Sequence, residues 1–309
     1  MKILIELPTW IGDAVMALPA IENIANSYTN SQITIVGSMA SVEIIDNHPQ
    51  VVKTYILKNK HSNLFRILRE LNEFDIFLSF RNSLRAKMFK AFISSKRKFQ
   101  FNKNKYPSRH QVEKYNSFVN ESLNLNLEAG NLKIYSQTPV MNSDKKYLGI
   151  NPGASYGSSK RWYSEEFAEL AKKLAQHYEI IIFGASEEKN IANEIEQLLI
   201  MKGVTNYSNL AGKTDIKGLI MKISTLSLFI TGDSGPMHIA AAFQVPTVSI
   251  FGPTRDEETS QWKNNKNIIV KKNLDCQPCM KRTCPLGHHN CMKLIRASEI
   301  LDAVKSITK

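Results

Sequence analysis

The sequence lacks the features that mark several large classes of protein. No run of apolar residues approaches the roughly 18 that a membrane-spanning helix needs. The first apolar segment, in MKILIELPTWIGD, is interrupted by Glu6, and no small-residue cleavage site follows it. We interpret this segment as an opening strand rather than a signal peptide. Neither the P-loop spacing GxxxxGK[ST] nor a clear GxGxxG is present. From these absences we expect a globular protein of the cytoplasm.

Cysteine is scarce, and all four cysteines fall within residues 276–291. The segment has the spacing C-x2-C-x4-C-x6-C and contains Cys276, Cys279, Cys284, His288, His289 and Cys291. Clustered thiols in a cytosolic protein favour a structural zinc site. The spacing differs from that of a standard zinc ribbon or finger, and it loosely resembles iron–sulfur patterns. Because a cytosolic location disfavours constitutive disulfides, reduced or redox-labile thiols are the alternative to bound metal.

Acidic residues are missing from one long stretch of the chain. Between Arg81 and Arg109 there are ten Lys or Arg and no Asp or Glu, in a chain of formal charge +12. A basic surface suits nucleic acid, anionic lipid or a phosphorylated substrate, and a solvated face is the alternative. The run carries no RRM, KH or helix-turn-helix signature, so a nucleic-acid partner is not expected, and a basic nucleic-acid-binding protein is kept only as an alternative.

Each half of the chain repeats a pattern of strand followed by helix. Apolar strands are predicted at 2–7, 32–37, 74–80, 147–153, 179–184, 226–232 and 247–252. The segment 81–130 is predicted to be helix and loop, and the polar segment 136–147 is predicted to be a linker. The pattern predicts an α/β protein with two doubly wound parallel-sheet domains, 1–144 and 145–309. The last helix, about 297–309, is a candidate to pack back on the first domain.

Three loops follow predicted strands, where doubly wound sheets bind ligands. In TGDSGPMH, Asp233 or Ser234 can cap the next helix, and a helix start beside Gly235 suits phosphate. His238 lies one turn further and could reach the same ligand. In NPGASYGSSKRW, the serines and Lys160 suit a diphosphate, with a surface turn as the alternative. In PTWIGD, Asp13 is either an N-cap or a general base.

Four motifs together resemble those of the bacterial ADP-heptose:lipopolysaccharide heptosyltransferases. They are IGDAVMALPAI, NPGASYGSSKRW, GDSGPMHIAAAFQVPTVSIFGPT and RTCPLGHHNCM, and the last is most similar to the heptosyltransferase II branch. The resemblance implies a GT-B architecture, with two Rossmann-like domains facing across a cleft. The acceptor would bind the N-terminal domain and the nucleotide sugar the C-terminal domain. The implied reaction is inverting transfer of L-glycero-D-manno-heptose from ADP-heptose to the inner-core heptose of lipopolysaccharide or lipooligosaccharide.

The resemblance also implies roles for individual residues. Asp13 would be the catalytic base, and Lys160 would act in catalysis by stabilising the leaving diphosphate. Asp233 would hold heptose hydroxyls, Glu188 the ribose, with Glu187 as its competitor, and Thr214 would lie beside the adenine. The implied donor site consists of Ser155, Lys160, Glu188, Thr214, Asp233, Ser234, Gly235 and His238.

The implied partners are ADP-heptose and an acceptor of the heptosyl-Kdo-lipid A type. A monomer in transient contact with the cytoplasmic face of the inner membrane is expected. The Arg81 to Arg109 run suits Kdo carboxylates and phosphates, but no particular acceptor-binding residue can be chosen. No cofactor is expected, and no DxD-like carboxylate pair near the phosphate loop indicates a catalytic divalent metal. A transferase of the same fold with another nucleotide sugar donor is the alternative.

Overall fold

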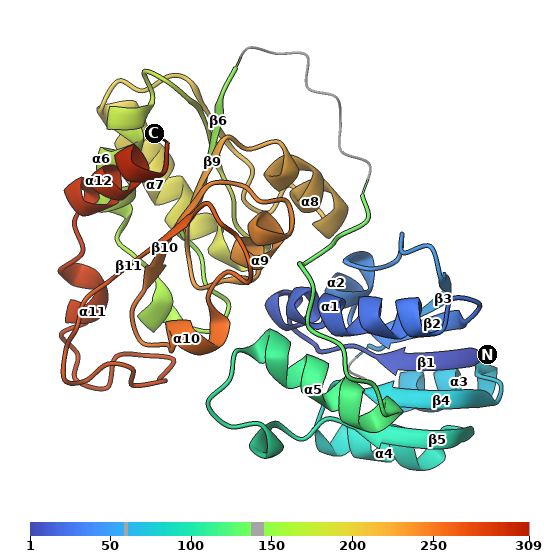
Figure 1. Ribbon diagram of the computed structural model, residues 1–309. Coiled ribbons are helices and arrows are strands. Elements are labelled where there is room, and N and C mark those ends of the chain that lie inside the picture. The colour runs from blue at the N-terminus through green and yellow to red at the C-terminus, as the bar shows by residue number, and fades with distance from the viewer. Residues whose placement is uncertain (59–60, 137–144, 309) are drawn as a thin grey trace. The chain divides into compact units, whose positions relative to one another are not determined.

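The computed structural model describes residues 1–58, 61–136 and 145–308, apart from the side chains of residues 61 and 62 (Figure 1). The chain divides into two compact units, Met1–Ser136 and Gln137–Lys309. Most of the predicted linker, and with it the predicted domain boundary at 144, lies outside the described residues.

The described part of the first unit is built on five parallel strands in the order β3-β2-β1-β4-β5. These are β1 (Lys2–Glu6), β2 (Gln32–Gly37), β3 (Val51–Ile56), β4 (Phe74–Ser79) and β5 (Ser95–Gln100). The order reverses direction between β1 and β4. The carboxyl ends of these two strands are therefore the topological switch point, where such sheets bind ligands.

Helices cover both faces of this sheet. They are α1 (Ile11–Ser27), α2 (Met39–Glu43), α3 (His61–Glu70), α4 (Leu84–Phe92) and α5 (Gln111–Leu123), with a 3₁₀ turn η1 (Lys103–Lys105). α1 packs against α5, and α3 packs against α4 (Figure 1). Leu64 of α3 and Phe89 of α4 are fully buried in one cluster with Phe77 of β4, which fixes both helices on the same face. Burial of such side chains contributes about 1.5–3 kcal/mol each.

The described part of the second unit contains a six-stranded parallel sheet in the order β11-β10-β9-β6-β7-β8. Its strands are β6 (Tyr147–Asn151), β7 (Glu179–Ile182), β8 (Tyr207–Asn209), β9 (Leu228–Gly232), β10 (Thr247–Phe251) and β11 (Asn267–Lys271). Here the direction reverses between β6 and β9. Since parallel connections are right-handed, the helices of the two directions lie on opposite faces, as a doubly wound fold requires.

The helices of the second unit include the end of the chain. They are α6 (Ser164–Leu174), α7 (Lys189–Met201), α8 (Ile216–Ser224), α9 (Gly235–Ala242), α10 (Asp256–Thr259), α11 (Asn290–Lys293) and α12 (Ala297–Ile307), with 3₁₀ turns η2 (Ser158–Lys160) and η3 (Ser186–Glu188). The candidate to pack on the first domain is α12. Its Ile300 and Val304 are buried in the core of the second unit, together with Trp162, and packing of this helix on the first domain stays a prediction. Within the described ranges, no helix has the length and apolar character to cross a bilayer.

The strands that the sequence predicted are the interior strands, and those it missed are the edges. β3 and β5 flank the first sheet, and β8 and β11 flank the second. The prediction of helix and loop for 81–130 is therefore wrong over β5. An interior strand is covered on both faces and has a continuous apolar run, whereas β5, with sequence SKRKFQ, carries the Lys and Arg residues that protect a sheet edge.

Candidate functional site

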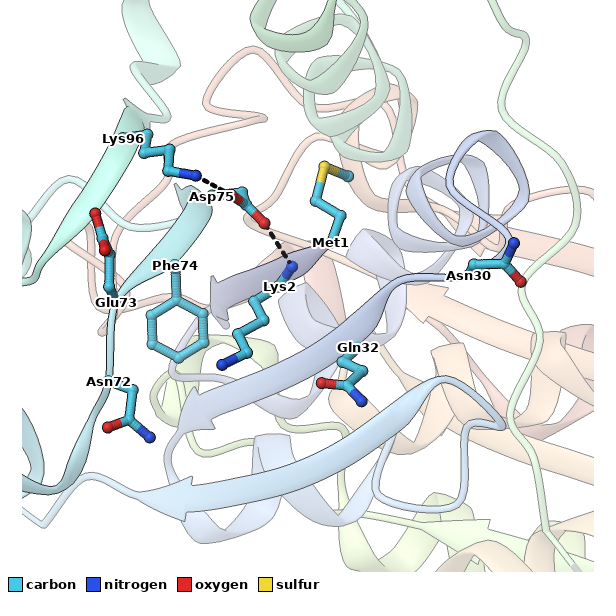
Figure 2. Close-up of a pocket in the computed structure, with 9 residues that line it drawn as sticks. All are labelled: Met1, Lys2, Asn30, Gln32, Asn72, Glu73, Phe74, Asp75 and Lys96. Atoms are coloured by element: carbon cyan, nitrogen blue, oxygen red, sulfur yellow. Dashed lines mark hydrogen bonds and ion pairs between the residues drawn. The ribbon is translucent and has the colours of Figure 1, made fainter.

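One hollow of the first unit lies at the amino edge of its sheet, which is the wrong edge for a substrate site. Figure 2 shows this hollow of about 830 Å³, lined by the amino ends of β1, β2 and β4. Asp75 in its wall accepts hydrogen bonds from Lys96 Nζ at 2.8 Å and from the Lys2 main-chain nitrogen at 2.9 Å. The Lys96 contact is the main cause that lowers the pKa of Asp75. Ligands of doubly wound sheets bind at the opposite, carboxyl edge.

A network of neutral polar groups marks the switch point of the second sheet. Asn151 ends β6 and pairs in register with Thr231 of β9. Its Nδ2 lies 3.4 Å from Thr231 Oγ1 and 3.3 Å from Ser234 Oγ, and the two hydroxyl oxygens are 2.9 Å apart. These bonds join the loops after β6 and β9, the two loops in which the sequence placed a diphosphate.

Lys160 and Asp233 form a largely buried ion pair beside this network. Lys160 Nζ donates to Asp233 Oδ2 at 2.6 Å, and the two side chains are 12% and 6% exposed. Thr254, after β10, donates its hydroxyl to the same carboxylate oxygen at 2.7 Å. The ammonium also lies 4.6 Å from the centre of the Tyr156 ring, a cation–π contact. Three loops thus hold one cation at the carboxyl edge of the sheet.

The start of α9 differs from the predicted cap. Ser234 occupies the N-cap position, but its side chain makes no capping hydrogen bond. The Asp233 carboxylate does not cap the helix either, because it binds Lys160 and Thr254. Pro236 occupies the first turn, where a missing N–H costs nothing. The first-turn N–H groups beside Gly235 are therefore not satisfied by a side-chain cap, as a phosphate-binding helix start requires. His238 is buried, with 2% exposure.

Glu188 lies at the same carboxyl edge of the second sheet, whereas Glu187 is exposed. Glu188 is buried and accepts a hydrogen bond from the Ala185 nitrogen at 2.8 Å. Its carboxylate lies against Gly153, where an added Cβ would come within 2.0 Å of Glu188 Cδ. A larger residue at position 153 would therefore displace the Glu188 side chain, and the loops after β6 and β7 meet at this carboxylate.

The remaining predicted donor residues lie on the same loops. Thr214 is half-buried and directly precedes Asp215, the N-cap of α8. Its loop joins the one after β7, because the Gly212 nitrogen donates to the Gly184 carbonyl at 2.8 Å. Ser155 is exposed on the loop that carries Lys160.

The cysteine-rich segment holds the Lys160 loop in place. Ser159 donates from its main-chain nitrogen to the Arg282 carbonyl at 3.1 Å and from its hydroxyl to the Lys281 carbonyl at 2.5 Å. Tyr156 Oη donates to the Met280 carbonyl at 2.8 Å. An added Cβ at Gly157 would lie 2.2 Å from the Arg282 oxygen, so this position requires glycine. The position of Lys160 therefore depends on the fold of residues 276–291.

The four cysteines are free and line one small cavity of about 20 Å³ together with Ser159. A hydrogen bond from the His289 nitrogen lowers the pKa of Cys284, whereas burial raises the pKa of Cys291 to about 11. His289 is engaged elsewhere: Nε2 lies 2.8 Å from the Ser159 carbonyl and Nδ1 lies 3.1 Å from Tyr163 Oη. Nowhere in the described ranges are three His, Cys, Asp or Glu side chains grouped as a metal site. Bound metal at the four thiols stays a prediction.

Asp13 lies at the carboxyl edge of the first sheet, but not at an N-cap. α1 begins at Ile11, with Trp10 as its N-cap, so Asp13 occupies the first turn. Tyr115 of α5 donates its hydroxyl to Asp13 Oδ1 at 3.4 Å. Burial and then the Asp13 charge raise the pKa of Tyr115. The tyrosine therefore stays a hydrogen-bond donor, and it orients the carboxylate.

Sequence reasoning missed Glu6, which is the polar centre of the first switch point. Glu6 ends β1, is fully buried and pairs in register with Ser79 of β4. Its Oε2 accepts from Ser79 Oγ at 2.6 Å and its Oε1 lies 3.3 Å from Arg81 Nη1. Burial raises the pKa of Glu6 despite these partners. The available signal was the carboxylate inside the apolar run KILIEL.

The basic run is distributed over several elements and has several uses. Arg81 binds Glu6, Lys96 binds Asp75, and Lys105 binds Glu121. Arg97 donates to the Ser122 carbonyl at 3.0 Å. Part of the run therefore makes contacts within the first unit. For those residues, no anionic partner is needed to explain the positive charge. The cations of α4 belong to a different surface, described below.

Comparison with known proteins agrees with this geometry. The family model described as glycosyltransferase family 9 (heptosyltransferase) matches residues 63–290. A lipooligosaccharide heptosyltransferase 2 of Campylobacter jejuni is 39% identical to this chain, covering 100% of it and 99% of the relative. Two solved Escherichia coli structures share the fold. ADP-heptose LPS heptosyltransferase II has a TM-score of 0.83 at 20% identity, covering 99% of this chain and 98% of that one.

The second solved structure is the E. coli heptosyltransferase WaaC with ADP, with a TM-score of 0.81 at 14% identity, covering 99% of this chain and 100% of that one. These matches and the two parallel α/β sheets confirm the predicted GT-B fold class. The family model matches well over half of the chain. The similarity to these proteins is therefore one of sequence as well as of fold. The chain belongs to glycosyltransferase family 9, the heptosyltransferases, and is a glycosyltransferase.

Proposed function

We propose that this protein is a heptosyltransferase II, which moves L-glycero-D-manno-heptose from ADP-heptose to the inner-core heptose of lipopolysaccharide or lipooligosaccharide. The observation that carries the proposal is the full-length, 39% identical relative of that name in C. jejuni. The second unit supports it, because a held cation and an uncapped helix start are the groups that a nucleoside diphosphate needs.

The reaction in this proposal is a single inverting displacement. A hydroxyl oxygen of the acceptor heptose bonds to the anomeric carbon of the donor as the bond from that carbon to the ADP oxygen breaks. Asp13 accepts the hydroxyl proton, and ADP leaves with the electron pair of the broken bond. The carboxylate of Asp13 accepts a hydrogen bond from Tyr115, which fixes its orientation as a general base requires.

Lys160 stabilises the negative charge that grows on the leaving diphosphate. Its ammonium has three N–H donors, and Asp233 engages two, through Oδ2 at 2.6 Å and through its main-chain oxygen at 3.3 Å. The third can bind a phosphate oxygen while the ion pair persists, so Asp233 positions Lys160 as well as contacting the heptose. Glu188, rather than the exposed Glu187, is the ribose ligand in this scheme, because its carboxylate lies at the carboxyl edge against Gly153. Thr214 lies beside the adenine of the bound nucleotide in this scheme.

The acceptor in this proposal carries Kdo carboxylates and phosphates on lipid A, and the enzyme meets it as a monomer at the cytoplasmic face of the inner membrane. The positive charge between Arg81 and Arg109 supports an anionic acceptor and a membrane contact. No cofactor is needed for the displacement, since Lys160 and the start of α9 supply the positive charge.

The test is transfer itself, followed by mass spectrometry of the acceptor. Purified protein is incubated with ADP-heptose and a heptosyl-Kdo acceptor freed of its acyl chains, and the expected product is heavier by one heptose. A panel of UDP- and GDP-sugars is run in parallel. Transfer from another nucleotide sugar, with none from ADP-heptose, would replace the proposed donor and keep the glycosyltransferase.

A further inference from the structure

Helix α4 exposes an apolar stripe that core packing does not explain. Leu84, Met88 and Phe92 recur at helical spacing on its outer side, and Leu84 and Phe92 are 76% and 62% exposed. The opposite side already carries the core contacts of the helix, through the buried Ala86 and Phe89. A surface helix of a globular domain usually has one apolar face. α4 has two, and only one of them is covered by the described residues of its own unit.

The apolar stripe continues onto the neighbouring helix. The ring centres of Phe65 on α3 and Phe92 on α4 lie 6.0 Å apart at an interplanar angle of 61°. Phe65 is 42% exposed, so both partners of this aromatic pair are open to solvent. α3 and α4 pack side by side on one face of the sheet (Figure 1). We call Phe65, Leu84, Met88 and Phe92 the α3–α4 patch.

The charges of these helices are almost all positive. α4 carries Arg85, Lys87 and Lys90 and no acidic residue, while α3 carries Arg66 and Arg69 against Glu70. The Arg66–Glu70 pair is an exposed i,i+4 contact at 3.5 Å and contributes little to stability. Apolar side chains flanked by Lys and Arg are the composition of helices that lie in the interface of an anionic bilayer.

We propose that the α3–α4 patch docks this protein on an anionic phospholipid bilayer. The rings and Leu84 enter the boundary of the acyl chains, and Lys87 and Lys90 contact the phosphate headgroups. The inference rests on the proposed function, in which the acceptor is carried by a lipid, and it deepens that function by naming the surface. Docking confines the enzyme to the plane of its acceptor and leaves the carboxyl edges of both sheets to the substrates.

Vesicle sedimentation tests the proposal without any need for activity. The full chain is mixed with vesicles of phosphatidylglycerol and phosphatidylethanolamine, and with vesicles of phosphatidylcholine alone. We expect binding to the anionic vesicles that weakens with salt and little binding to the neutral ones. Equal binding to both would overturn the charge part of the proposal.

Two double variants and one matched control locate the surface. L84S with F92S removes the apolar part, K87E with K90E reverses the charge, and each is expected to weaken vesicle binding by at least about tenfold. I200S with M201S changes two residues of α7 that are also 53% and 74% exposed, and it should bind as the parent does. Thermal unfolding and ADP titration of every variant show whether it folds. Folded α4 variants that bind vesicles normally would overturn the proposal.

Two further measurements separate the rival explanations. If the parent chain is a dimer in sedimentation and the α4 variants are monomers, the patch is an interface between copies, and the proposal is wrong. Transfer to the acceptor without acyl chains is expected to be the same in the parent and in L84S with F92S, which leaves every Lys and Arg of the Arg81 to Arg109 run in place. If the parent fails to transfer to that acceptor yet binds anionic vesicles through α4, the proposed function fails and the docking surface stands.

Discussion

The two sheets place different chemistry at the same topological position. At the switch point of the first sheet, Glu6 faces Ser79 and holds Arg81. At that of the second, Asn151 faces Thr231, and the carboxylate is displaced onto the following loop, where Asp233 holds Lys160. Glu6 is the last residue of its strand and is fully buried, whereas Asp233 lies on a loop.

This difference separates a structural ion pair from a binding ion pair. Glu6 is fully buried, and burial raises its pKa, which indicates a group that the fold holds at some cost. Lys160, by contrast, lies on a loop beside an uncapped helix start. Substitutions in the first pair should therefore change stability, and substitutions in the second should change nucleotide affinity.

The largest effect is expected for Asp13→Asn, which tests whether the first unit contributes chemistry in addition to structure. An amide cannot take the proton from the attacking hydroxyl of the acceptor sugar, so turnover should fall by about 10²–10⁴-fold. ADP affinity and the unfolding midpoint should stay unchanged. Asp75→Asn is the matched control, because Asp75 lies at the amino edge of the same sheet. Normal turnover of Asp13→Asn would remove Asp13 from the mechanism.

Glu6→Ala is expected to lower the free energy of unfolding by about 3 kcal/mol, because it leaves Arg81 without its buried partner. Urea unfolding measures this change, and Asp233→Ala should cost less. Because the folded pKa of Glu6 is raised above 4.5, the stability that comes from its proton is present below pH 4.5 and is lost as pH rises through the raised pKa, whereas its contacts with Ser79 and Arg81 persist.

A pH series tests the sign of this effect. Relative to Glu6→Gln, whose amide does not titrate, the parent protein should be more stable at pH 4 than at pH 7. The opposite slope would show that Arg81 outweighs burial at this carboxylate. The difference between the two proteins is the quantity to compare, since the other acidic groups titrate in both.

Lys160→Ala should weaken ADP binding by about 2 kcal/mol, or roughly 30-fold, as loss of a charge-assisted phosphate contact predicts. Isothermal titration measures the affinity. Lys202→Ala is the matched control, because Lys202 forms a more exposed ion pair with Glu169 in the same unit. If both variants bind ADP equally well, the second ion pair is structural like the first.

The smallest effect is expected from chelators. The proposed displacement uses Lys160 and a helix start in place of a divalent cation, so EDTA should leave turnover unchanged. Metal analysis of the purified protein addresses the thiols separately. Activity that is abolished by EDTA and restored by Mg²⁺ would contradict the proposed role of Lys160, whereas loss restored by Zn²⁺ would indicate that the cysteine-rich segment needs metal to hold the Lys160 loop.

The strands that the sequence predicted are those that are buried on both faces of the sheets. The interior strands β1, β2, β4, β6, β7, β9 and β10 were found because each is an apolar run. The edges β3, β5, β8 and β11 were missed because they pair on one side only, and in β5 the Lys and Arg residues hide the strand. The helix cap at Ser234 was predicted from local chemistry and is not formed, because its hydroxyl instead contacts Thr231, three positions away, and Asn151, which is 83 positions away.

The candidate site shows the same limit. The loops that carry Asp13, Lys160 and Asp233 were predicted from strand ends, and the structure joins Lys160 to Asp233. No spacing rule could show that residues 276–291 support the loop of Lys160, because those hydrogen bonds span more than 120 residues. Nor could it show Glu6 as a paired group, since Ser79 and Arg81 lie more than 70 positions away.

Trp162 gives the second unit an optical reporter. Its indole is 3% exposed, donates to the Ile295 carbonyl at 2.9 Å and follows Lys160 by two positions. An indole in such surroundings emits at shorter wavelength than an exposed one such as Trp10, which caps the helix that carries Asp13 and is 54% exposed. Once the third tryptophan, Trp262, is replaced by phenylalanine, the blue side of the fluorescence spectrum reports events around Lys160, and the red side reports those around Asp13.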